Sequence, residues 1–328
     1  MNNFLFENGT RVLFGGGCVQ EYLGSFVKGY GPSVLLVTEE GDHRSGAADE
    51  VRDILRRSGK TTAECSAGPF CPRYEQVQRA ARLCRERRVD LILGVGDSAV
   101  LDGCKAASLA AVCRGDLWEN FGESQGVVDV PPLPTGFVAS HLDTGAVSGA
   151  TGLLHGRRCV WRDYPPCDPK FALLDPARTR ELSRRELILQ GFSALAGALE
   201  EYLTLADGMS VSREMLETLM EGMARELRIC RQAPGGSRFF QLGRRFSFPA
   251  LPVREAAVLA ASDWEEYAGV LAVLLLALCR REAEGHPAAL AALLAELSLP
   301  TEPEQLGAAV RRRLEKVPST KNLLVHTA

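Results

Sequence analysis

The chain has 328 residues, of which 46% are hydrophobic and 24% are charged, and its formal net charge is −3. These values are ordinary for a globular protein that is long enough to form two domains. The small net charge gives no electrostatic argument for binding nucleic acid or a membrane surface, so we expect neither as a partner.

The ten cysteines are scattered along the chain, without a CxxC pair and without histidines at zinc-finger spacing. This pattern indicates reduced thiols rather than a disulfide framework or a zinc site. Cys65 and Cys71 are close in sequence, but nothing around them favours a functional pair.

No signal peptide is evident in residues 1–15, and the longest apolar run, residues 268–279, is about half the length of a membrane span. The sequence therefore predicts a cytoplasmic protein.

Strands and helices alternate in the first half of the chain. Apolar runs predict strands at residues 10–15, 33–38, 62–65, 90–93, 135–140, 159–161 and 171–174, and helical spacing predicts helices at 20–27, 47–57, 74–88 and 99–112. This alternation is typical of a parallel sheet with right-handed crossovers.

The second half of the chain has helical periodicity almost throughout. The predicted helices cover residues 186–204, 210–228, 256–283, 287–297 and 302–316. The change of pattern between residues 175 and 183 predicts an α/β domain at 1–178 and an all-helical domain at 179–328.

A loop at residues 232–245 (Gln232 to Arg245) interrupts the helical half with prolines, glycines, arginines and two phenylalanines. Such a basic and aromatic loop could contact RNA or an acidic partner. Because the patch is short, we favour an exposed loop with a hydrophobic anchor.

The most informative stretch is DLILGVGDSAVLDGCK, residues 90–105. It predicts a buried strand, a tight turn at residues 94–98 and the start of a helix, which together are typical of a phosphate cradle. Gly94, Gly96, Asp97 and Ser98 are therefore candidate cofactor-binding residues. However, the Asp97 carboxylate would repel a phosphate, and Asp97 and Ser98 could instead simply cap the helix. The residues leave both interpretations open.

Several segments together resemble the iron-containing (type III) alcohol dehydrogenases, and in particular their NADPH-dependent butanol dehydrogenase branch. These segments include NGTRVLFGGG (8–17), SVLLVTEEGDHRSG (33–46), DLILGVGDSAVLDGCKAAS (90–108), DTGAVSGA (143–150) and the helical stretch at 170–204. The resemblance implies a Rossmann-like parallel-sheet domain followed by an all-helical domain, the dehydroquinate synthase-like fold. It also implies NAD(P)-dependent oxidation of alcohols or reduction of aldehydes.

The chain departs from this family at the dinucleotide turn. The resemblance implies a Gly-Gly-Gly-Ser run where this chain has Gly96, Asp97, Ser98 and Ala99. Side chains at two of the three glycine positions would hinder the approach of a pyrophosphate to the backbone.

Two other cofactor segments of the family are also altered. The glycine-rich turn after the second strand is replaced by Glu39-Glu40-Gly41-Asp42, whose carboxylates would oppose the 2′-phosphate of NADP more than they oppose NAD. The Thr-Gly-Ser-Glu signature survives only as Thr144-Gly145, so Thr144 is a further candidate cofactor contact. NAD(P) is allowed by the resemblance but is not required by these residues.

The resemblance also implies four metal-ligand positions, one Asp and three His. Ser193, Gly197, Val253 and Tyr267 occupy them in this chain, and none is an ordinary ligand of Fe²⁺ or Zn²⁺. We therefore expect no metal at these positions.

Three residues are candidates for acid–base chemistry without a metal. His141 and Asp143 flank a predicted strand end beside the cofactor region, although His141 could instead pack in the sheet or cap a turn. Tyr267 could donate a proton, or it could fill the volume of the lost metal and imidazole.

Two functional hypotheses follow. The first is a degenerate family member, a pseudoenzyme with a binding or assembly role, which binds a small molecule or pairs with itself or an intact paralogue. The alternative is an active NAD(P)H-dependent alcohol dehydrogenase or aldehyde reductase that works without metal or through other ligands. The cofactor and metal positions are altered at separate places in the chain, which favours the first.

Overall fold

The computed structural model describes residues 9–39, 46–123, 130–142, 147, 150–162, 164–205, 209–232, 252–282 and 286–320. The chain forms two compact units, of which the first extends to Arg178 and the second begins at Thr179.

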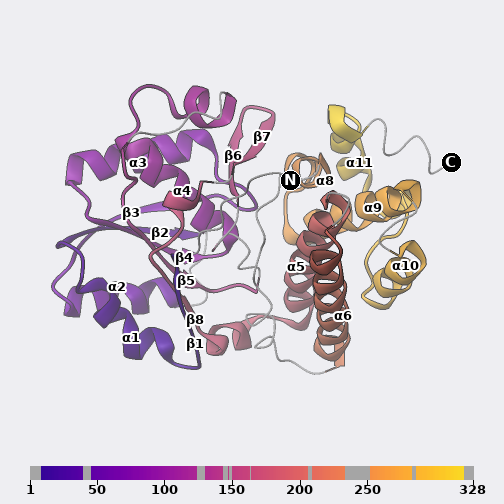
Figure 1. Cartoon of the computed structure of the whole chain (residues 1–328), viewed down its shortest axis with the longest axis horizontal. Helices are drawn as coiled ribbons and strands as arrows, with labels where there is room; N and C mark the ends of the chain where they lie inside the picture. Colours follow the sequence, from indigo (N-terminus) through magenta and orange to yellow (C-terminus); the bar gives the residue numbers. More distant parts are fainter. Residues whose placement is uncertain are drawn as a thin grey trace. The chain divides into compact units, whose positions relative to one another are not determined.

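The first unit is a layered α/β structure (Figure 1). Its sheet contains β1 (Arg11–Phe14), β2 (Ser33–Glu39), β3 (Thr61–Ala67), β4 (Leu91–Gly96), β5 (Thr135–Ala139) and β8 (Phe171–Leu174), and its helices are α1 (Cys18–Val27), α2 (Ala47–Arg57), α3 (Tyr74–Arg87) and α4 (Ser98–Val112). The strand order is β1-β8-β5-β4-β2-β3, and every neighbouring pair is parallel. The predicted parallel-sheet fold is confirmed.

The two faces of the sheet are covered by different helices. Successive side chains of a strand point to opposite faces, and Leu91, Leu93 and Val95 of β4 share a buried cluster with apolar residues of α1 and α2. The helices α3 and α4 cover the other face (Figure 1). Because both faces are covered, β4 is buried along its whole length.

A small antiparallel hairpin, β6 (Thr151–His155) and β7 (Arg158–Arg162), accompanies the sheet. The sequence predicted a strand only at residues 159–161 and missed β6. Gly156 in the turn has a φ of 59°. The hairpin is attached to α4, because the carboxylate of Asp102 accepts a hydrogen bond of 3.0 Å from the Gly152 N–H.

The second unit is helical, as predicted. Its described α-helices are α5 (Arg184–Thr204), α6 (Ser210–Gln232), α8 (Pro252–Ala260), α9 (Trp264–Glu282), α10 (Pro287–Glu296) and α11 (Ala308–Leu314). A capping box starts α5, in which the Ser183 hydroxyl accepts the Glu186 N–H and the Glu186 carboxylate accepts the Ser183 N–H. Helix α5 packs against α6 and α9.

Two predicted helices of this unit are wrong in part. The single helix expected at 256–283 is divided into α8 and α9, because the Asp263 carboxylate accepts the Glu266 N–H at 2.8 Å and starts a new helix there. The helix expected at 302–316 is a short 3₁₀ turn followed by α11. Residues 233–245 of the predicted basic loop lie outside the described residues.

None of the helices in the described part of the chain is long and apolar enough to cross a membrane. The apolar run at residues 268–279 belongs to α9, and most of its side chains are fully buried within the helical unit.

The predicted turn at residues 94–98 also needs correction, because β4 continues through Gly94 to Gly96. A Cβ atom on Gly94 would lie 2.9 Å from the Cys104 Sγ and 3.3 Å from Val100 Cγ1. Gly94 is thus a place where α4 approaches the strand closely.

We expect Gly94→Ala to lower the free energy of unfolding by about 1–3 kcal/mol, because the added methyl group overpacks this contact. Urea denaturation measures the change, and part of the loss should be recovered in a Cys104→Ala background. Gly103→Ala is the matched control, since its Cβ would meet neighbours at an ordinary 3.5 Å. Equal losses for Gly94→Ala and Gly103→Ala would contradict this account.

Candidate functional site

The strand order of the sheet reverses between β2 and β4. From β2 the chain continues outward to β3, whereas β4, β5 and β8 follow on the other side of β2. Ligands of open parallel sheets bind at the carboxyl ends of the strands at such a reversal. Here that edge carries Glu39 at the end of β2, Asp97 after β4 and His141 after β5.

At this edge, Asp97 caps helix α4. Its side-chain Oδ1 accepts a hydrogen bond of 3.0 Å from the Val100 N–H, and the residue is only 2% exposed. The structure thus shows Asp97 as the N-cap of α4, whereas nucleotide binding at this turn stays a prediction. The carboxylate lies where the N–H groups and the positive end of the helix dipole would meet a phosphate.

The other predicted cofactor residues have different surroundings. Gly96 has a φ of 157°, and a Cβ there would lie 2.5 Å from Val100 Cγ2, so the turn requires glycine. Ser98 is the first residue of α4. Gly94 lies inside β4, and Thr144 lies outside the described residues.

His141 joins two other polar side chains at the same edge. Its Nδ1 lies 2.7 Å from the Ser140 Oγ, and its Nε2 lies 3.6 Å from a carboxylate oxygen of Glu39. Asp143, the predicted partner of His141, lies outside the described residues. Because β4 separates β5 from β2 in the sheet, the imidazole reaches across the end of β4.

A second glycine-rich turn, between β1 and α1, is also occupied by a carboxylate. Both oxygens of Asp175 accept the Gly17 N–H, at 3.1 and 3.0 Å, and one of them also accepts the Ala177 N–H. Asp175 is buried. Two helix N-termini of the sheet domain thus carry an anion from the chain itself.

Comparison with known proteins identifies the family. The profile described as "Iron-containing alcohol dehydrogenase" matches residues 9–176. The chain belongs to the iron-containing alcohol dehydrogenase family.

Its similarity to curated proteins extends beyond the sheet domain. The chain is 30% identical to the probable NADH-dependent butanol dehydrogenase 1 of Bacillus subtilis over 225 residues, which cover 67% of this chain and 57% of that protein. It is 29% identical to the NADPH-dependent aldehyde reductase YqhD of Escherichia coli, over 62% of this chain and 53% of the relative. The matched region therefore spans only a little more than half the length of these relatives.

Solved structures share the fold over nearly the whole chain. A crystal structure of Escherichia coli K-12 YqhD has a TM-score of 0.78 at 21% identity and covers 98% of this chain and 93% of that chain. Sulfoacetaldehyde reductase from Bifidobacterium kashiwanohense, crystallised with NAD⁺, has a TM-score of 0.73 at 15% identity, with 97% and 94% coverage.

The residues that the sequence resemblance assigns to metal-ligand positions are not ordinary ligands of a divalent cation. Ser193 and Gly197 are buried in α5, Val253 is buried in α8, and Tyr267 is buried in α9 with its ring packed edge-on against Trp264 at 5.6 Å. No group of three or more His, Cys, Asp or Glu side chains in the described part of the chain could hold a metal. A lone hydroxyl and a phenol do not form an ordinary Fe²⁺ or Zn²⁺ site.

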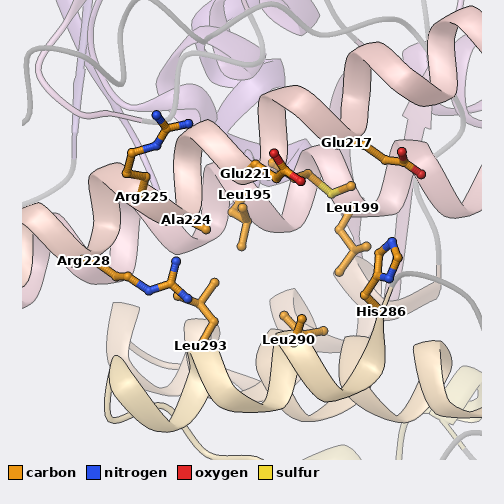
Figure 2. Close-up of a pocket in the computed structure, with 12 residues that line it drawn as sticks. Leu195, Leu199, Glu217, Glu221, Ala224, Arg225, Arg228, His286, Leu290 and Leu293 are labelled. Atoms are coloured by element: carbon orange, nitrogen blue, oxygen red, sulfur yellow. The ribbon is translucent and has the colours of Figure 1, made fainter.

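The helical unit contains a cavity of about 450 Å³ between α5, α6 and α10 (Figure 2). Its walls are mainly apolar and include Leu195, Leu199, Met220, Ala224, Ala289, Leu290 and Leu293. In Figure 2, Arg225 and Arg228 lie toward one end and Glu217 and His286 toward the other. Its volume falls within the roughly 300–1,000 Å³ range of small-molecule sites.

This cavity lies apart from the residues of α5 that the sequence resemblance assigns to metal-ligand positions. Residues two apart on a helix are separated by about 200° around its axis, so Leu195 and Leu199 lie on the side of α5 opposite Ser193 and Gly197. No residue that the sequence predicted as functional lines the cavity. Its lining comes from three separate helices, so no local motif could have revealed it.

We expect Asp97→Ala to destabilise the chain by about 1 kcal/mol, because the Val100 N–H loses its cap. Urea denaturation at neutral pH measures this loss. Asp97→Ser is the control, since a serine hydroxyl can accept the same hydrogen bond. If Asp97→Ala and Asp97→Ser were equally stable, the capping bond would have no energetic importance.

Proposed function

We propose that this chain is a binding or assembly member of the iron-containing alcohol dehydrogenase family that does not carry out metal-dependent hydride transfer. The observation that carries the proposal is the Asp97 carboxylate at the N-terminus of α4. It supplies an anion at the place where the fold would otherwise bind a pyrophosphate.

The repulsion between Asp97 and a phosphate would be larger than the attraction of the helix N-terminus for the phosphate, which favours exclusion of the dinucleotide. Two like charges about 4 Å apart repel by about 4 kcal/mol at an effective dielectric constant of about 20. A helix N-terminus stabilises an anion by only about 0.3–2 kcal/mol. Glu39, at the same edge, adds a second negative charge that disfavours NADPH most, because of its 2′-phosphate.

The metal positions support the same proposal. In metal-dependent enzymes the cation stabilises developing negative charge by several kcal/mol in the transition state. The side chains of Ser193, Val253 and Tyr267 do not provide the ligands for such a cation.

Two features support a binding role. The cavity between α5, α6 and α10 has the size and apolar lining of a small-molecule site. Among the described residues of the sheet, β1 pairs with β8 alone, and its Val12 and Phe14 are 53% and 39% exposed, which suits an edge that pairs with a second chain.

We expect 1 mM NADH or NADPH to leave the melting temperature of the chain unchanged. A variant with Asp97→Gly, Ser98→Gly and Ala99→Ser, which restores the family's glycine run, should gain NADH binding. At a Kd of about 10 µM, 1 mM NADH would stabilise the variant by about 2.7 kcal/mol, which raises its melting temperature by several degrees.

Asp97→Asn is the control for this experiment, because it removes the negative charge and keeps a side-chain acceptor. It should recover part of the binding if charge is the main obstacle. A clear NADH-induced shift in the unmodified chain would refute the proposal that Asp97 excludes the dinucleotide.

A second candidate function is NADH-dependent reduction of an aldehyde or ketone without a metal. It is supported by the names of the relatives and by one local observation, the contact of His141 with Ser140 and Glu39 at the switch-point edge. Reduction of a carbonyl requires a proton for the oxygen, and an imidazole beside a carboxylate can hold and donate one.

The second candidate predicts slow NADH-dependent reduction of butanal that is insensitive to EDTA. His141→Phe should then lower kcat/KM by about 10²–10⁴-fold, because the proton donor is lost. His155→Phe is the matched control, since His155 also lies 3.6 Å from a carboxylate, that of Glu75, and belongs to the β6–β7 hairpin rather than to β5 and its end. Absence of turnover in the unmodified chain would eliminate this candidate and leave the first.

A further inference from the structure

Two buried thiols are in contact in the sheet domain. The Sγ atoms of Cys71 and Cys159 lie 3.2 Å apart although the residues are 88 positions apart in the sequence. Cys71 is 2% exposed and Cys159 is 8% exposed. The contact therefore depends on tertiary structure.

The backbone on both sides of this contact is held by hydrogen bonds. Leu154 lies directly opposite Cys159 in the β6–β7 hairpin, and its N–H donates to the Pro72 carbonyl at 2.9 Å. Arg73 and Leu154 also form an isolated parallel bridge. The segment that carries Cys71 is thus attached to the strand beside Cys159, and the two sulfurs can bond with little movement of the main chain.

Three other buried cysteines, Cys84, Cys104 and Cys167, have thiols whose pKa is raised by burial. Burial raises the pKa of the Cys84 and Cys167 thiols to about 12, and it raises the pKa of Cys104 well above its ordinary value. A thiol reacts as its thiolate, so these three cysteines are poor nucleophiles.

We propose that Cys71 and Cys159 form an oxidisable site that a hydroperoxide converts into a disulfide. One sulfur attacks the peroxide O–O bond, which gives a sulfenic acid and one molecule of water. The second thiol then attacks the sulfenic sulfur, which forms the S–S bond and releases a second water. Two thiols and one hydrogen peroxide give one disulfide and two waters, and the two electrons lost by sulfur reduce the peroxide.

The bond would link the segment before α3 covalently to β7. It would close a long loop in the unfolded chain, which reduces the conformational entropy of that state. The oxidised protein should therefore melt about 5 °C or more above the reduced protein.

The experiment uses the full chain, reduced with dithiothreitol, freed of reductant under nitrogen and treated with one equivalent of hydrogen peroxide. Titration of the denatured protein with Ellman's reagent should then find two thiols fewer than the ten in the sequence. Tryptic mapping without reductant should show residues 61–73 joined to residues 159–162. Dithiothreitol should reverse the link and the rise in melting temperature.

Residues 61–73 contain both Cys65 and Cys71, so Cys65→Ser is the matched control. It should keep the cross-link to residues 159–162, whereas Cys71→Ser and Cys159→Ser should each abolish it together with the gain in melting temperature. The peptide map of the unmodified chain is decisive even if a serine variant folds poorly. Ten free thiols after peroxide treatment, or a cross-link between other cysteines, would overturn the proposal.

Discussion

The hydrogen bond from the Val100 N–H to the Asp97 carboxylate fixes the start of helix α4 at the carboxyl edge of the sheet. A helix that follows a parallel strand presents free N–H groups and a positive dipole end, and these groups must be satisfied by the chain, by water or by a ligand. In this chain they are met at α4 by Asp97 and at α1 by Asp175. A group that stabilises the folded chain in this way also competes with any anion that would bind there.

In the helical unit, the residues that the sequence resemblance assigns to metal-ligand positions are packed in the interior. Tyr267 lies against Trp264, and Val253 is buried beside Arg254, whose guanidinium pairs with Glu200 at 3.1 Å. A pair of buried charges is costly to separate because each would remain in a medium of low dielectric constant. Helices α5 and α8 are therefore joined by an internal ion pair in the region where the family resemblance implies metal ligands.

The periodicity of the sequence was sufficient to predict the order of the main elements. The alternation in the first half required a parallel sheet, and an aspartate before a helical stretch was enough to suggest the cap at Asp97. The break between α8 and α9 was missed because both sides continue the apolar spacing, although Asp263 carried the local capping signal. Strand β6, TGLLH, was missed because Leu153 and Leu154 are its only strongly apolar residues.

The contacts that matter chemically were less accessible from sequence, because they join distant segments. Asp143, the predicted partner of His141, lies outside the described residues, and the strand order brings Glu39, which the sequence did not connect with His141, to the same edge. The sequence places Cys71 close only to its neighbour Cys65, whereas in the structure its sulfur contacts that of Cys159 in strand β7. Periodicity specifies which residues share a face of one element, but it does not specify which elements become neighbours.

Membership of a dehydrogenase family specifies the fold of this chain, but it does not by itself specify which reaction the chain carries out. A fold provides positions, and function depends on the side chains that occupy them. The decisive physical question is whether an anion can replace Asp97 at the N-terminus of α4. A buried carboxylate leaves that position only if its new surroundings solvate it as well as the Val100 N–H and the helix dipole do. Glu39 places a second negative charge at the same edge of the sheet. An anion at the N-terminus of α4 would therefore have to displace the Asp97 carboxylate at an edge of the sheet that also carries Glu39.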